Sequence, residues 1–211
     1  EVIATVPAGA YPYALCYNPQ NNSIYCANHE SYDVTVIDGA TKQVVTTVTA
    51  GCWPQALCYS PQSNKVYCAN DGSDNVTVID GATNRVTAIV NAGDMPYALC
   101  YNSTDDKVYC ANQKSGNVTV IDGTTNHVIT TVTAGEGPYA LGYNSTDDKV
   151  YCANQESSNV TVIDGATNQV ITAVTTGGYP RALCYNPRNN KVCSANQAGN
   201  NVTVIDGTTN E

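Results

Sequence analysis

The chain has 211 residues, of which 42% are hydrophobic and 13% charged, and this composition is typical of a compact globular protein. Eighteen acidic side chains oppose nine basic ones, so no basic surface is available to neutralise phosphates, and we expect no nucleic-acid partner. No apolar run approaches the roughly twenty residues that span a bilayer, which predicts no membrane insertion.

The first predicted element is a strand over Glu1–Val6, which is rich in β-branched residues. This segment lacks the charged and apolar regions of a signal peptide, and the chain does not begin with Met. We therefore expect a processed product or an excised fragment.

An internal repeat follows and fills the rest of the chain. The string Val-Ile-Asp-Gly begins at Val36 and returns every 42 residues, at Val78, Val120, Val162 and Val204. The flanking strings keep the same spacing, as Tyr25-Cys26-Ala27-Asn28 shows. A period of this length indicates one small structural unit per copy.

Each copy predicts four short strands separated by turn-forming residues. In the third copy these strands cover Tyr97–Tyr101, Lys107–Ala111, Asn117–Asp122 and His127–Val132. Gly, Pro, Asn, Asp and Ser gather between them, and no helical period is present. Both alternate sets of Val118–Ile121 are β-branched or apolar, as expected of a sheet that is covered on both faces.

These observations predict an all-β, five-bladed β-propeller with four antiparallel strands per blade, formed by residues 1–211 as a single domain. The last predicted strand is Val202–Asp206, a third strand with no fourth behind it. We expect the N-terminal strand to pair with it, which would close the ring and predicts a monomer. A parallel β-helix is the alternative, but no atypical terminal repeat is evident that could cap it.

Three stretches of the second copy resemble the YVTN family of β-propeller repeats: Tyr67–Asn70, Asn75–Asp80, and Val90–Gly93 with Pro96. The resemblance covers the entire chain, although Cys-Ala stands where the family signature has Val-Thr. It implies an extracellular or cell-surface location, because the family is typical of surface-layer and secreted proteins. Relatives with this repeat also include redox and lactonase-like enzymes, so the resemblance does not assign a chemistry.

Two sets of loops differ between the copies: those that connect consecutive blades and those between the second and third strands. Both sets are expected on one face, around the central channel. Aromatic side chains that supply contact area with a polar edge favour a binding site there. The candidate ligand-binding residues are Tyr11, Tyr13, Trp53, Gln55, Met95, Tyr97, Tyr139, Tyr179 and Arg181. Neutral divergence of tolerant loops explains the same pattern equally well.

Little in the sequence indicates catalysis or a metal. His29 and His127 are the only histidines, they fall on opposite faces, and each is interpreted as a solvated loop residue. The ten cysteines form no Cys-x-x-Cys motif, and in the fifth copy Cys184 is expected opposite Ser194, so free thiols are favoured over disulfides. A hydrolase or lyase mechanism would use Asp94 and Glu136 as its carboxylate pair.

We therefore predict a non-enzymatic extracellular or cell-surface binding module that needs no cofactor or metal and presents its inter-blade loop face to a protein, peptide or glycan. The alternative is a purely structural surface-layer repeat array or part of a longer propeller tract. A hydrolase or lyase is the least favoured interpretation.

Overall fold

The computed structural model describes residues 1–211 and contains five antiparallel sheets, each formed by one copy of the repeat. Four sheets have four strands in sequential order, and the fifth has three. The elements are β1 (Pro12–Asn18), β2 (Ser23–Asn28), β3 (Asp33–Asp38), β4 (Val44–Thr49), β5 (Pro54–Ser60), β6 (Lys65–Asn70), the short 3-10 helix η1 (Asp71–Ser73), β7 (Asn75–Asp80), β8 (Arg85–Asn91), β9 (Pro96–Asn102), β10 (Lys107–Asn112), β11 (Asn117–Asp122), β12 (Val128–Thr133), β13 (Pro138–Asn144), β14 (Lys149–Asn154), β15 (Asn159–Asp164), β16 (Val170–Thr175), β17 (Pro180–Asn186), β18 (Lys191–Asn196) and β19 (Asn201–Asp206).

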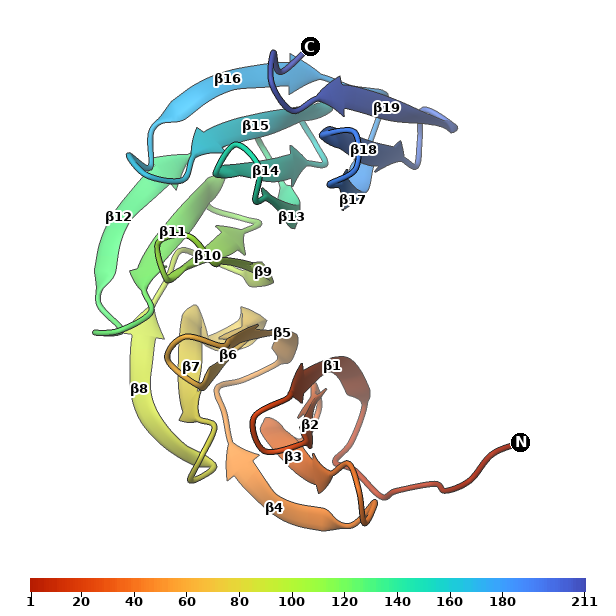
Figure 1. Ribbon diagram of the computed structural model, residues 1–211, viewed down its shortest axis with the longest axis vertical. Coiled ribbons are helices and arrows are strands. Elements are labelled where there is room, and N and C mark those ends of the chain that lie inside the picture. The colour runs from red at the N-terminus through yellow and green to blue at the C-terminus, as the bar shows by residue number, and fades with distance from the viewer.

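The sheets are the blades of a β-propeller, arranged as an arc (Figure 1). The first strand of every blade lies on the concave side, and the fourth strand runs along the outside before it leads into the next blade. This arrangement and the strand boundaries confirm the predicted blade within about one residue in the third copy, where β9 to β12 cover the four expected segments. No helix in the structure has both the length and the apolar character needed to cross a membrane.

The core consists of a hydrophobic cluster at each interface between consecutive blades. At the first interface Tyr25, Val34 and Val36 of one blade pack against Val66 and Ile79 of the next. In the second, third and fourth blades both faces of each central strand therefore become buried, one against the preceding blade and one against the following blade. This explains why both alternate sets of side chains in the third strand are apolar.

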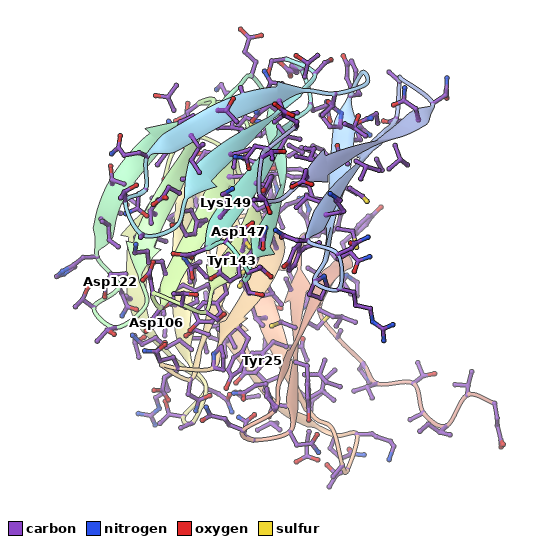
Figure 2. The ribbon with its side chains drawn as sticks, turned by 45° about the horizontal axis from the view of Figure 1, so that its top comes forward. Tyr25, Asp106, Asp122, Tyr143, Asp147 and Lys149 are labelled. Carbon is purple, nitrogen blue, oxygen red and sulfur yellow. The ribbon has the colours of Figure 1, made fainter.

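Polar side chains join neighbouring blades at the end of the strands opposite the inter-blade loops. Tyr109 is fully buried, and its hydroxyl donates to Asn168 Oδ1 (2.8 Å) and Gly165 O (3.2 Å) of the next blade. Lys107 Nζ donates to the same Gly165 carbonyl at 2.6 Å. We call this Tyr/Lys contact the turn lock. Lys149, labelled in Figure 2, forms the equivalent contact with the carbonyl of Gly207.

The Asp that ends each third strand caps the following turn, as its position before Gly predicts. Asp80 Oδ1 accepts hydrogen bonds from the Thr83 hydroxyl and the Thr83 N–H, both at 2.7 Å. These bonds favour the ionised carboxyl and lower the pKa of Asp80. The aspartates of the other copies make the same turn, and their role is structural.

The structure does not show the predicted closure of the ring. Residues 1–8 form no strand, and the N-terminal segment leaves the arc on its open side, away from β19 (Figure 1). Val2 and Ile3 are 83% and 81% exposed, and Val202 and Val204 of β19 are 60% and 56% exposed.

The rotation between blades explains the opening, because it is set by the side chains packed between two sheets. The four rotations that relate the five blades leave a gap between the first and fifth blades (Figure 1). One of the polar contacts that join blades is also missing across this gap. Cys193 stands at the position of Tyr109 in the turn lock, and Lys42 stands at the position of its acceptor Asn168.

The strand register separates most cysteine pairs. Cys16 lies opposite Tyr25, and Cys26 lies opposite Leu15, so the side chains of the two cysteines point to opposite faces of the sheet. The expectation for the fifth copy was wrong, because Cys184 lies opposite Cys193 rather than Ser194. The register is the same as in the first blade, where Cys16 lies opposite Tyr25, but in the fifth copy Cys193 occupies the position of that tyrosine, so two cysteines lie opposite each other. All ten cysteines are free thiols in the structure.

Candidate functional site

Backbone hydrogen bonds tie each inter-blade loop to the loop between the second and third strands of the following blade. The His29 N–H donates to the Tyr11 carbonyl (2.8 Å), and the Asp71 N–H donates to the Trp53 carbonyl (3.0 Å). The same bond recurs in the other three blades, at 2.8–2.9 Å. The two variable sets of loops therefore share one face, as predicted, and we call it the loop face.

The residue before the proline of each inter-blade loop has a left-handed backbone conformation. The φ angles are 56° for Tyr11, 56° for Trp53, 58° for Met95 and 57° for Tyr179, while Gly137 occupies the fourth copy at 67°. Glycine adopts this conformation without steric cost, whereas bulky residues rarely adopt it. The aromatic candidates thus stand where the backbone alone would favour glycine.

Three rings form a first cluster over the first two blades. The His29 and Trp53 rings are stacked, with centroids 5.9 Å apart and planes 6° from parallel, and Tyr13 lies 5.9 Å from His29 on a tilt. Gly72 leaves room for the indole, because a Cβ on Gly72 would lie 2.8 Å from Trp53 Cε3. Asp71 lies near His29, and partial burial raises the pKa of Asp71 while the imidazole opposes this shift.

A second cluster spans the third, fourth and fifth blades. The Tyr97 hydroxyl donates to the Tyr139 hydroxyl at 2.9 Å, and the ring centroids are 4.5 Å apart. The Arg181 guanidinium lies 5.1 Å from the centre of the Tyr139 ring, and its Nε donates to Gln155 Oε1 at 2.8 Å. Burial raises the pKa of Tyr97, and the nearby hydroxyls of Tyr139 and Tyr13 raise it further.

Most of the predicted candidates thus converge on the loop face. Tyr13, Gln55, Tyr97, Tyr139 and Arg181 occupy the same position in consecutive copies, directly after the proline that starts each inner strand. Gln55 is buried.

The remaining candidates occupy other parts of the loop face. Met95 lines a hollow of about 560 Å³ with Lys114, Glu136 and Glu156, and Asp94 is not among the lining residues. Tyr11 and Tyr179 are exposed and lie outside both ring clusters.

Sequence reasoning missed two participants. His29 was interpreted as a solvated loop residue, yet it is half-buried between Tyr13 and Trp53. Gln155 was not selected, although it orients Arg181. His29 and Gln155 both occupy the first position of the variable loop after the second strand. In every blade the N–H at this position bonds to the inter-blade loop that precedes the blade, so its side chain also lies beside the candidate residues.

Comparisons with known proteins agree with this fold. No curated protein matches the chain. Among solved structures it is similar to one titled Kuenenia stuttgartiensis hydrazine synthase, with a TM-score of 0.79, 20% identity and coverage of 92% of this chain and 58% of that chain. At that identity the likeness shows the fold alone, and this chain spans 58% of the other.

A model of the YNCE-like beta-propeller family matches residues 60–206 of this chain. This match agrees with the predicted resemblance to YVTN-type propeller repeats, which is thereby confirmed. The matched segment includes complete blades and most of the chain. The protein accordingly belongs to the YNCE-like β-propeller family.

Proposed function

We propose that this protein is a non-enzymatic binding module whose ligand lies across the aromatic residues of the loop face. The observation that carries the proposal is the left-handed conformation of Tyr11, Trp53, Met95 and Tyr179. Such a conformation costs about 1–2 kcal/mol for a residue with a side chain. Gly137 at the equivalent position supports the view that these large side chains are not needed for folding. Contact with a ligand is a role that would retain them.

The exposed rings suit a ligand with flat apolar faces and polar edges. Tyrosine and tryptophan supply large contact areas, and their hydroxyl or N–H groups add a directional hydrogen bond. A sugar ring or an aromatic peptide side chain offers the matching surface. The resemblance to surface-layer and secreted repeat proteins supports an extracellular or cell-surface setting for such a ligand.

The non-enzymatic part of the proposal is supported by the histidines. His29 is engaged in the ring stack, and His127 follows a third strand at the opposite end of the blade. No nucleophile is hydrogen-bonded to either side chain, so the arrangement does not resemble a nucleophile–base pair.

Oligosaccharide and peptide arrays test the proposal with the intact chain and two variants. Trp53→Ala removes an exposed ring from the loop face, and Ile129→Ala is its control, because Ile129 is also 45% exposed but lies on the outer strand β12. We expect binding that Trp53→Ala abolishes and Ile129→Ala preserves. Absence of any binder on both arrays, or equal loss in both variants, would refute the proposal.

A further inference from the structure

Two cysteines of the fifth blade lie directly opposite each other on neighbouring strands. Cys184 of β17 is paired in register with Cys193 of β18, and the pairs on either side keep the same register. Residues that are directly opposite on antiparallel strands project from the same face of the sheet and have neighbouring Cβ atoms. The two thiols therefore lie side by side on one face of the blade.

The spacing of such a pair suits a disulfide. Opposite residues of an antiparallel ladder have Cα atoms about 4.5 or 5.5 Å apart, depending on the hydrogen-bonding pattern at that point. A disulfide joins residues whose Cα atoms are about 4.4–6.8 Å apart, so both patterns allow the bond. The Cys184 thiol donates one long hydrogen bond, of 4.0 Å, to the Tyr185 carbonyl, and a contact this weak does not hold the sulfur in place.

The other cysteines within strands lack this arrangement. Each lies opposite a tyrosine or a leucine: Cys16, Cys26, Cys58, Cys68, Cys100, Cys110 and Cys152. Burial also raises the pKa of these thiols, to about 11 at Cys16 and about 12 at Cys100. Because the thiolate is the form that attacks a disulfide, burial slows their oxidation. Geometry and reactivity therefore single out the same pair.

We propose that Cys184 and Cys193 are an oxidation site, at which a low-molecular-weight disulfide converts the two thiols into a bond between β17 and β18. The thiolate of one cysteine attacks the small disulfide, forms a mixed disulfide and releases one small thiol. The thiolate of the other cysteine then attacks the protein sulfur of the mixed disulfide and releases the second small thiol. The protein loses two protons and two electrons, and the small disulfide gains them.

The site is contained in a single hairpin. β17 and β18 are joined by the turn at residues 187–190, so the bond closes a short loop inside one blade and requires no other segment of the chain. The second step takes place within one molecule, between groups that the ladder already holds together, and this proximity favours closure over attack by a second oxidant molecule. The proposal rests on the strand register and is independent of the binding function proposed above.

Oxidised glutathione in excess tests the proposal on the 211-residue chain, followed by alkylation of the remaining thiols in denaturant and mass spectrometry. Cys52→Ser is introduced throughout, because Cys52 is an exposed thiol outside the strands and would form a mixed disulfide of its own. Of the nine cysteines that then remain, we expect seven to be alkylated after oxidation and all nine after reduction with dithiothreitol. Trypsin places Cys184 in residues 182–188 and Cys193 in residues 192–211, so the bond joins two separate peptides.

Cys193→Tyr is the matched control, because tyrosine stands at this position in the other four blades. This variant should yield no joined peptides. Three results would each overturn the proposal: nine alkylated thiols after oxidation, a bond between any other two peptides, or glutathione retained on Cys184 or Cys193 without a bond between them. The last result would show that the two sulfur atoms do not reach each other.

Discussion

Loss of the Tyr109 hydroxyl tests how strongly the turn lock holds adjacent blades. In Tyr109→Phe the ring and its packing remain, and Gly165 O still accepts from Lys107 Nζ at 2.6 Å. Asn168 Oδ1 loses its donor, because Lys107 reaches the carbonyls of Gly165 and Ala166 but not this amide. Asn168 is buried, and an orphaned buried acceptor costs about 1–3 kcal/mol. We expect Tyr109→Phe to lower the free energy of unfolding by about 1–2 kcal/mol.

The preceding blade supplies a contrast within the same molecule. Asn126 Oδ1 accepts from both Tyr67 (3.4 Å) and Lys65 (3.0 Å), so Tyr67→Phe leaves this acceptor with a partner. Its expected cost is therefore smaller, about 0.5 kcal/mol, at the low end for a net hydrogen bond. Tyr17→Phe is the control for an exposed hydroxyl and should change stability by less than about 0.5 kcal/mol.

Urea unfolding followed by circular dichroism measures all three variants, with the m-value checked for constancy. The reasoning predicts that Tyr109→Phe is the most destabilising, followed by Tyr67→Phe and then Tyr17→Phe. Equal losses for Tyr109→Phe and Tyr67→Phe would show that the second donor from Lys65 is irrelevant and would refute the argument.

Two further predictions concern alkaline pH and the first ring cluster. Burial raises the pKa of Cys100 from 9.0 to about 12 and that of Tyr151 from 10.0 to about 12. Folding favours the neutral thiol and phenol, so their contribution to the free energy of unfolding is complete below pH 9 and is lost as the pH rises toward 12. The urea midpoint should therefore fall between pH 9 and pH 12. A constant midpoint would contradict the prediction. Gly72→Ala should displace the Trp53 indole from His29, since the new Cβ would lie 2.8 Å from the ring, and the emission of this single tryptophan should shift. Gly199→Ala, at a loop with no tryptophan, is its control and should leave the emission spectrum unchanged.

Much of the blade could be predicted because it depends on local chemistry repeated in five copies. The alternation of β-branched residues around Val120, the turn-capping Asp122 and the proline that starts each inner strand each affect only the few residues next to them. The same spacing correctly placed the two sets of variable loops on one face, because antiparallel strands return every second connection to the same end.

The contacts inside the candidate site were harder to predict. Stacking of His29 on Trp53 depends on how the second blade sits beside the first, and the guanidinium of Arg181 reaches Tyr139 across another blade boundary. Such contacts are set by the packing of whole sheets, and a repeat length carries no information about the rotation between them. Cys184 and Cys193 illustrate the same limit at short range, because their register was assigned wrongly from the sequence.

By itself the sequence determined the strands, the turns, the antiparallel blade and the number of copies, since these follow from side-chain periodicity and from turn chemistry that acts locally. Only the tertiary structure decided that the arc stays open, because closure depends on the sum of the rotations between blades and on contacts that the first and fifth blades do not share. The same sum decides which aromatic side chains meet on the loop face.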